Sequence, residues 1–283
     1  MIEAPSSGRS PETTVDAGPS HPLPERPVER SSAAAADRSA GCSQPGGLIP
    51  EAVPSAGPSK PRRPGRVDLM RLERTYWKQG YVRIAGVDEA GMGPLAGPVV
   101  AGAVVFAPGT RIRGARDSKT LTARSRTELD EEIRRRALCC AIGVADLDDI
   151  QMWNIYHAGL LAMRRALEAL DPCPDFVLVD ARRVPGLPWP QEARIKGDAQ
   201  IHCVACASIL AKVHRDRLMV EYDHLYPDYG FAEHKGYATR AHREAIARLG
   251  PSPIHRRGFR GLGDQLELFD TMDQPSRLPA APV

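Results

Sequence analysis

One stretch of this sequence, residues 83–98, constrains the fold more than any other. It begins with a short apolar run containing β-branched residues, reaches two adjacent carboxylates, Asp88 and Glu89, and then breaks into glycine and proline. The pattern predicts a strand that brings both acids to its carboxyl end, followed by a loop whose backbone can come close to a ligand. Open sheets bind their ligands at strand ends of this kind.

Strand and helix patterns alternate along the chain around this stretch. Apolar runs predict strands over residues 81–88, 98–106, 138–145, 175–180 and 193–195. Helical spacing predicts helices over residues 69–77, 122–136, 152–170, 200–224 and 239–249. The alternation is typical of an α/β fold, and the direct step between strands near residue 97 favours a mixed sheet.

Apolar residues make up 42% of the 283 residues but are unevenly spread. The first 65 or so residues are rich in Pro, Ser, Ala and Gly without any periodicity, so they bury too little surface to offset chain entropy. We therefore predict a disordered arm over residues 1–67, a folded domain over 68–260 and a flexible tail over 261–283.

The six cysteines do not have the spacing of a disulfide or zinc framework. Cys203 and Cys206 form a single CxxC with no second pair, and we interpret them as small buried hydrophobes. The sequence has neither a signal-peptide pattern nor the roughly 20 consecutive apolar residues of a membrane span. We expect a reduced, cytoplasmic protein that does not contact a membrane.

Basic residues recur beside the candidate site, although the net charge of the chain is only +3. Each one alone is typical of solvated surface, but their recurrence near carboxylates favours a polyanionic partner, because neutralised phosphates release counterions. They are Arg111, Arg113, Arg116, Arg182, Arg183, Lys212, Arg215 and Arg217. This distribution favours nucleic acid as the partner.

Two further acids are candidates for the same site: Asp180 ends the strand over 175–180, and Asp198 precedes the helix over 200–224. Carboxylates without thiolate or imidazole ligands suit Mg²⁺ or Mn²⁺, and two such ions can assist phosphodiester hydrolysis. Neighbouring side chains of a regular strand point to opposite faces. Asp88 and Glu89 can therefore share a metal site only if their strand bends near Gly91.

A dinucleotide-binding loop is the competing interpretation, because Gly91-Met92-Gly93 begins like a GxGxxG motif. The third glycine is missing, Pro94 obstructs the helix that should follow, and the preceding carboxylates would repel a pyrophosphate. We therefore disfavour it.

Taken together, the motifs resemble those of the ribonuclease HII family over about residues 72–259. In chain order they are Gly86–Val100, Asp117–Leu121, Val179–Asp180, Ile195–Asp198, Ala207–Asp216, Tyr229–Phe231, His234–Thr239 and Gly250–Arg256. The resemblance implies an RNase H-like α/β fold, with a mixed β-sheet flanked by helices and a small C-terminal helical subdomain. We expect a monomer.

The resemblance also implies a function. The enzyme would be a metal-dependent endonuclease, using Mn²⁺ or Mg²⁺, that cuts the RNA strand of RNA–DNA hybrids. It would also cut on the 5′ side of single ribonucleotides embedded in duplex DNA, leaving 3′-hydroxyl and 5′-phosphate ends. The metal-binding and catalytic carboxylates carried over by motif are Asp88, Glu89, Asp180 and Asp198.

Substrate-binding residues follow from the same motifs. The backbone of Gly91, Met92 and Gly93 would sense the 2′-hydroxyl, by which a protein tells RNA from DNA, and Tyr237 would pack on the sugar. The expected contacts to backbone phosphates are Ser118, Lys119, Lys212 and Arg215. Asp216 is expected to hold Arg215.

The chain departs from the family pattern at three positions. Met92 replaces an arginine, which removes a guanidinium able to grip phosphate and leaves affinity or junction preference open. Ala181 replaces a glycine and Cys206 an alanine, and both changes are small.

The tail contains Gln265-Leu266-Glu267-Leu268-Phe269, which resembles the motif by which bacterial repair enzymes dock on the sliding clamp. A tethered Gln265 with Leu266, Leu268 and Phe269 as apolar anchors can enter a preformed pocket. The alternative is a terminal element that packs Leu268 and Phe269 back on the domain.

Two functions follow as hypotheses: an active ribonuclease, or a catalytically weakened hybrid-binding relative tethered to the clamp. The four carboxylates favour the enzyme, because a pure binder gains nothing from negative charge beside phosphate.

Overall fold

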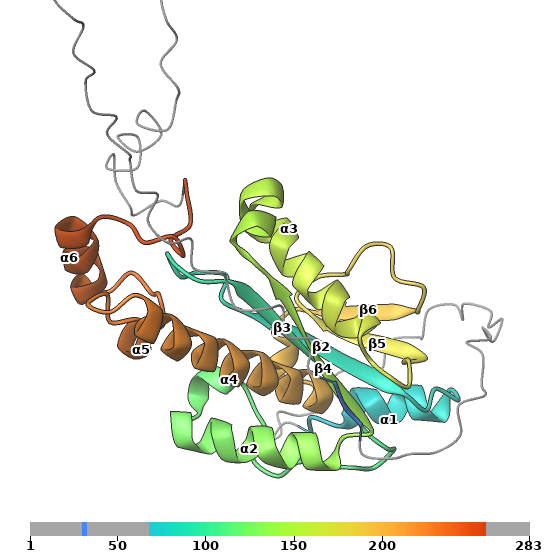
Figure 1. Cartoon of the computed structure of the whole chain (residues 1–283). Helices are drawn as coiled ribbons and strands as arrows, with labels where there is room; N and C mark the ends of the chain where they lie inside the picture. Colours follow the sequence, from blue (N-terminus) through green and yellow to red (C-terminus); the bar gives the residue numbers. More distant parts are fainter. Residues whose placement is uncertain (1–29, 33–67, 259–283) are drawn as a thin grey trace, which may run out of the picture.

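A mixed sheet of six strands forms the centre of the fold, in the order β1-β4-β3-β2-β5-β6 (Figure 1). The computed structural model describes residues 30–32 and 68–258. The strands are β1 (Arg30–Ser32), β2 (Ile84–Ala90), β3 (Val99–Val105), β4 (Cys139–Ala145), β5 (Phe176–Asp180) and β6 (Gln191–Arg194). β5 is parallel to β2 and β6, whereas β3 is antiparallel to β2 and β4. The predicted mixed α/β sheet is confirmed.

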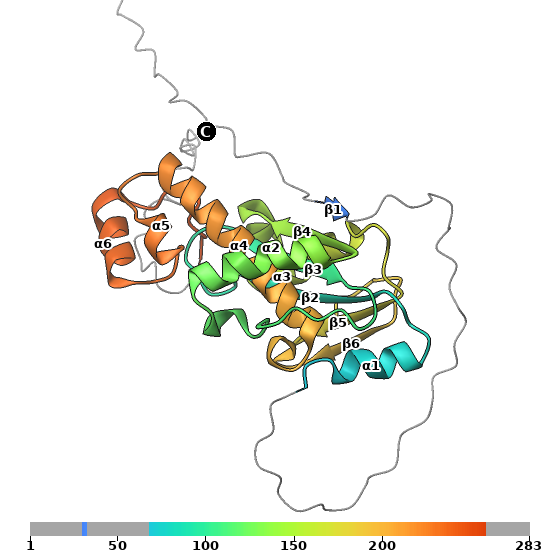
Figure 2. The ribbon, with the colours of Figure 1, turned by 90° about the horizontal axis from the view of Figure 1, so that it is seen from below.

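Helices cover both faces of this sheet (Figures 1 and 2). The long helix α4 lies against β2 and β3 on one face, with α2 packed on it, and α3 covers β3 and β4 on the other. α5 and α6 lie beyond the end of the sheet (Figure 1). The helices are α1 (Arg71–Lys78), α2 (Ala123–Arg136), α3 (Leu147–Glu168), α4 (His202–Leu225), α5 (Phe231–His234) and α6 (Arg240–Leu249), with short 3₁₀ turns η1 (Ser118–Thr120) and η2 (Gly197–Ala199).

The two faces of the sheet build two apolar layers. In β2, Ile84 belongs to the layer under α4, whereas Ala85 and Val87 belong to the layer under α3. All seven residues of β3 are buried, as predicted for a strand covered on both sides. Gly86 lets α4 approach closely, since a Cβ there would lie 2.3 Å from the backbone carbon of Cys203. The start of α4 is thereby pressed against the strand that carries Asp88.

Three elements differ from the sequence predictions. β1 lies within the arm predicted to be disordered, where it pairs with the outer edge of β4, whose backbone groups can bind an extended segment. β2 continues to Ala90, so Asp88 and Glu89 lie inside the strand. α3 begins earlier than predicted, because Asp146 caps it, and it kinks at Asn154. The rest of the arm, and the tail with Gln265–Phe269, lie outside the described residues.

The buried cysteines behave as predicted. Cys203 and Cys206 are free thiols, and burial raises the pKa of both. Both are small apolar members of the layer under α4. Of the helices in the described ranges, none has the length and apolar character needed to cross a bilayer.

Candidate active site

Four carboxylates gather at one edge of the sheet. Asp88 and Glu89 lie near the end of β2, Asp180 ends the neighbouring parallel strand β5, and Asp198 lies in η2 just before α4. Parallel strands bring their carboxyl ends to the same edge, which is why the sequence could place these acids together. Asp88 and Asp198 are buried, with 4% and 5% of their surfaces exposed.

Asp88 and Glu89 point to opposite faces of β2. The strand does not bend between them, since each pairs in register with β3, opposite Gly102 and Ala101. Asp88 faces α4, where Ser208 donates a hydrogen bond to it, whereas Glu89 lies 3.0 Å from the guanidinium of Arg182. As the side chains stand, no three His, Cys, Asp or Glu within the described ranges are placed to hold one metal ion.

The mutual repulsion of these acids appears in their pKa values. Burial, followed by the charges of Glu89 and Asp180, raises the pKa of Asp88 well above its usual range. Burial and then Asp180 likewise raise the pKa of Asp198. Burial raises the pKa of Glu89 even though Arg182 opposes the shift. The cluster is therefore unfavourable for negative charge as long as no cation lies among the carboxylates.

The donor set fits a hard divalent cation by its chemistry, because all candidate ligands are carboxylate oxygens. Two of these oxygens are held by backbone amides: Asp180 Oδ1 accepts the Gly197 N–H at 2.6 Å, and Asp88 Oδ1 accepts the Glu89 N–H at 2.7 Å. Glu89 Oε2 is buried and accepts no hydrogen bond from the described part of the chain. This orphaned oxygen, together with the mutual repulsion, supports a cation site that needs some side-chain rearrangement.

The loop after β2 adjoins this cluster. Gly93 is exposed, and a Cβ on it would lie 4.0 Å from the ring of Tyr237, which is itself 43% exposed. The side chain of Met92 turns the other way and packs on α3, where its Sδ lies 3.0 Å from the place of a Cβ on Gly159. An open backbone and an exposed aromatic ring thus stand beside the carboxylates.

Comparison with known proteins identifies the family. The family model described as Ribonuclease HII matches residues 85–261. The chain belongs to the ribonuclease HII family. It is 53% identical over 213 residues to ribonuclease HII of Myxococcus xanthus, covering 75% of this chain and 72% of that protein. It is 51% identical over 200 residues to ribonuclease HII of Syntrophotalea carbinolica, covering 71% and 96%.

Solved structures agree with this family. Ribonuclease H2 from Pyrococcus horikoshii superposes with a TM-score of 0.57 at 27% identity, covering 66% of this chain and 99% of that one. Ribonuclease HII from Archaeoglobus fulgidus, solved in a complex with PCNA, gives 0.52 at 28% identity, covering 63% and 96%. The expected RNase H-like fold is confirmed, and the protein is an endonuclease that hydrolyses RNA in RNA–DNA hybrids.

Two predicted phosphate contacts of this ribonuclease are wrong as the side chains stand. Arg215 is 0% exposed, and its guanidinium donates to the carbonyls of Ala96, Pro98 and Lys235. Ser118 is also buried, with its hydroxyl 2.8 Å from that of Ser208. The helical spacing around Arg215 does not reveal which side chains turn inward, and the Asp117–Leu121 motif does not reveal the burial of Ser118.

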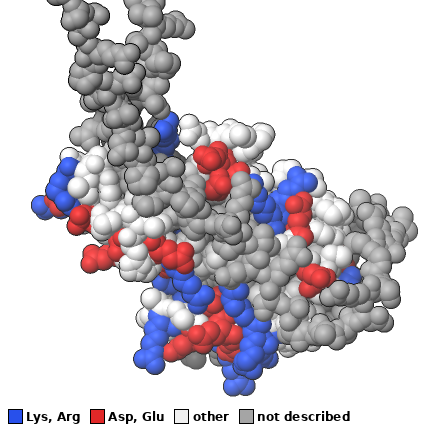
Figure 3. Space-filling model, in the orientation of Figure 1, with Lys and Arg blue, Asp and Glu red and all other residues white. Residues whose placement is uncertain are grey.

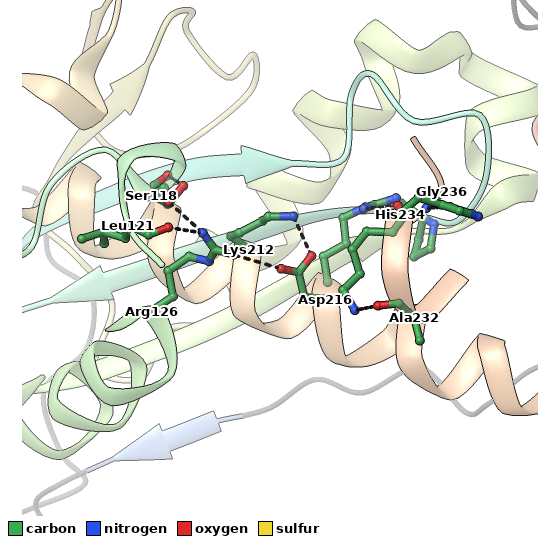
Figure 4. Close-up of polar contacts among 12 residues, drawn as sticks. Ser118, Leu121, Arg126, Lys212, Asp216, Ala232, His234 and Gly236 are labelled. Atoms are coloured by element: carbon green, nitrogen blue, oxygen red, sulfur yellow. Dashed lines mark hydrogen bonds and ion pairs between the residues drawn. The ribbon is translucent and has the colours of Figure 1, made fainter. Parts of the chain in front are cut away.

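Lys212 and Asp216 form a largely buried pair on α4 (Figure 4). Lys212 Nζ lies 2.6 Å from Asp216 Oδ1 and 5.6 Å from the centre of the Tyr237 ring. Asp216 also lies 3.6 Å from Arg126. The prediction that Asp216 holds Arg215 is therefore wrong. The expected phosphate contact of Lys212 stays a prediction.

Lys119 lies among the carboxylates. Partial burial lowers its pKa, but Asp198 and the other nearby acids raise it, and the net shift is upward. The Asp117 carboxylate accepts the N–H of Lys119 at 2.9 Å and so orders the turn that carries it. Elsewhere, basic and acidic side chains are interspersed, as over α2 at the lower edge of Figure 3, where Arg124 and Glu128 pair at 2.8 Å. Lys119 thus brings positive charge to the carboxylates.

Sequence reasoning missed how Arg182 acts. Its guanidinium contacts Glu89 and also lies 4.5 Å from the centre of the Tyr156 ring on α3. Tyr156 and the neighbouring Trp153 are 47% and 54% exposed. The position of Arg182, two residues after Asp180, was a usable signal, because it follows the strand whose end meets β2.

Proposed function

We propose that this ribonuclease HII cuts on the 5′ side of a single ribonucleotide embedded in duplex DNA, in addition to cutting the RNA strand of hybrids. Its products would carry 3′-hydroxyl and 5′-phosphate ends. The observation that carries the proposal is the open loop at Gly93, which follows Asp88 and Glu89 closely in the chain and faces Tyr237. Chemistry and sugar recognition would then occupy one place.

The loop is suited to reading a ribose. Gly93 has no side chain to cover its backbone, and of the described residues other than its chain neighbours, only Tyr237 comes within 4.0 Å of the place of its Cβ. A 2′-hydroxyl both donates and accepts hydrogen bonds, so a bare backbone can tell it from a 2′-hydrogen. The exposed ring of Tyr237 offers an apolar wall for the sugar of the neighbouring nucleotide.

Enzymes of this family depend on divalent metal ions. In this chain Asp88, Glu89, Asp180 and Asp198 would hold Mn²⁺ or Mg²⁺. The bound cations would supply electrostatic stabilisation of the attacking and leaving oxygens. Arg182 keeps the Glu89 carboxylate in place at 3.0 Å, and the Lys119 ammonium offers positive charge for a phosphate next to the acids.

We also propose that the tail docks on a sliding clamp through Gln265, Leu266, Leu268 and Phe269. The complex of Archaeoglobus fulgidus ribonuclease HII with PCNA supports a clamp as partner for a relative of this fold. Pull-down of the full chain on purified bacterial clamp tests the idea. The double variant Leu268→Ala/Phe269→Ala should lose binding, and equal binding by both proteins would contradict it.

The main proposal is tested on a labelled DNA duplex with one ribonucleotide, incubated with Mn²⁺ or Mg²⁺. We expect one cut on the 5′ side of the ribonucleotide. The downstream product should be a substrate for ligation, which requires the 5′-phosphate that we propose. Binding without any cut, of this duplex or of a hybrid, would favour the alternative of a weakened hybrid binder. Cutting of the hybrid alone would reject the single-ribonucleotide substrate.

A further inference from the structure

The inner side of the loop over residues 91–98 is held by Arg256, which is 2% exposed. Its Nη2 donates to the carbonyl of Gly91 at 2.6 Å, and its Nη1 to those of Met92 at 3.3 Å and Pro94 at 2.8 Å. Its Nε donates to the carbonyl of Gly97 at 2.9 Å. One side chain from the C-terminal segment thus collects carbonyls from most of the loop.

Arg215 continues this arrangement from α4. It donates to the carbonyls of Ala96 at 3.0 Å and Pro98 at 3.1 Å, and to that of Lys235 at 3.0 Å. It therefore ties the far end of the loop to the segment that carries Tyr237. The Leu95 N–H donates to the Gly236 carbonyl at 2.8 Å and makes a second tie to the same segment.

The loop glycines fit these arginines. Gly91 has a φ of +98°, and a Cβ on it would lie 2.3 Å from Arg215 Nε. The sequence pattern predicts that a ligand comes close to the loop glycines. At Gly91 the group that approaches is Arg215, on the inner side, while Gly93 stays open on the outer side.

The direction of the carbonyls sets the direction of the amides. In a trans peptide the C=O and N–H point in opposite directions. Because Arg256 draws the carbonyls of Gly91 and Met92 inward, the N–H groups of Met92 and Gly93 point outward. Neither of these N–H groups donates a hydrogen bond to another part of the described chain, whereas the Leu95 and Gly97 N–H groups are both used internally.

We infer that Arg256 and Arg215 are positioning residues for ribose recognition. Arg256 sets the outward N–H groups of Met92 and Gly93, and Arg215 sets the distance between this loop and Tyr237. The inference rests on the proposed function, in which that backbone reads the 2′-hydroxyl. Neither arginine touches the substrate.

The test compares the dissociation constants of two duplexes, all-DNA and DNA with one ribonucleotide, by fluorescence anisotropy. All proteins carry Asp88→Asn so that nothing is cut. Arg256→Lys keeps the charge but loses the planar fork, and it should lower the ratio of the two constants about tenfold, the worth of one hydrogen bond. Arg165→Lys is the matched control, because Arg165 donates to the Val144 carbonyl at 2.7 Å, outside the loop. Its ratio should not change.

The ratio of the two dissociation constants is used because partial unfolding of a variant weakens its binding to both duplexes equally. If the Asp88→Asn parent does not discriminate between the duplexes, the proposed function fails. If the parent discriminates and Arg256→Lys does so equally well, the positioning inference is overturned.

Amide hydrogen exchange tests the same inference without a variant at Arg256. In the Asp88→Asn protein, the N–H groups of Met92 and Gly93 should exchange faster than those of Leu95 and Gly97. The ribonucleotide duplex should slow the first pair more than the all-DNA duplex does. Slow exchange of the Met92 and Gly93 amides before substrate is added would contradict the outward orientation.

Discussion

Asp88 and Arg256 are both buried, with 4% and 2% of their surfaces exposed, yet their surroundings differ in kind. Asp88 lies among other carboxylates, and burial followed by these neighbours raises its pKa. Burial lowers the pKa of Arg256 to about 9, but carbonyls of the loop surround its guanidinium. The carboxylates around Asp88 (the acidic region) thus need a cation to balance their charge. The guanidinium of Arg256 (the basic region) already has hydrogen-bond partners within the fold. The first is suited to chemistry and the second to holding shape.

The largest effect on stability is expected when the hydrogen bonds of Arg256 to the loop carbonyls are removed. Arg256→Met should lower the free energy of unfolding by about 3 kcal/mol or more, because it leaves several buried carbonyls without donors. Urea denaturation measures this value. A loss below about 1 kcal/mol would show that the loop does not depend on the guanidinium.

A divalent metal ion bound among the carboxylates should stabilise the native protein. Mn²⁺ at about 100 times its dissociation constant should stabilise the wild type by roughly 2.7 kcal/mol, since a bound cation favours the native state. Calorimetric melting with and without Mn²⁺ at neutral pH checks this. Asp180→Asn should lose most of the effect. Equal stabilisation of both proteins would place the cation elsewhere.

Acid should act on the C-terminal segment through His242 and His255, whose Nε2 atoms lie 3.0 Å apart. Burial, helped by the charge of neighbouring histidines, lowers both pKa values from 6.5 to about 4. The unfolded chain therefore binds protons that the native chain does not, so this contribution to stability is present above pH 6.5 and is lost as the pH falls toward 4. His255→Gln should flatten the pH dependence of the melting temperature in this window, and an unchanged slope would contradict the assignment.

The smallest effect is expected at the outer side of the loop. Met92→Arg should raise cleavage of the hybrid or of the ribonucleotide junction by a few-fold, on the order of one surface phosphate contact. Because Met92 packs on α3, the melting temperature of the variant should also be slightly lower. Single-turnover rates at several salt concentrations measure the gain. An unchanged or lower rate would show that no phosphate contact is missing.

The layers and the acidic cluster could be predicted because they follow from periodicity. Alternating apolar runs placed β2, β3, β4 and β5 to within a few residues, and the carboxyl ends of β2 and β5 brought Asp88 and Asp180 together. Asp198 was a candidate from its place just before the helix over 200–224, and the family motifs assigned all four acids to metal binding and catalysis. These features depend on local pattern and on strand pairing, both of which a single sequence contains.

The direction of long side chains could not be predicted. Arg215 and Lys212 lie three residues apart on α4, yet one is buried among carbonyls and the other pairs with Asp216. Which of them turns inward depends on where the loop over residues 91–98 and the segment near Lys235 pack, and the contacts of Arg215 with the loop span more than a hundred residues of sequence. The pairing of β1 with β4 was missed for the same reason, since only the open edge of β4 selects it.

The central claim is that the carboxylates at the carboxyl end of β2 carry the metal-dependent cleavage. The most direct test is single-turnover cutting, with Mn²⁺, of a duplex containing one ribonucleotide. Asp88→Asn is compared with Asp175→Asn, whose carboxylate instead accepts the Arg83 N–H at 2.9 Å near the start of β2. We predict a loss of about a thousandfold or more for Asp88→Asn and retained cutting for Asp175→Asn. Similar rates for the two variants would contradict the account.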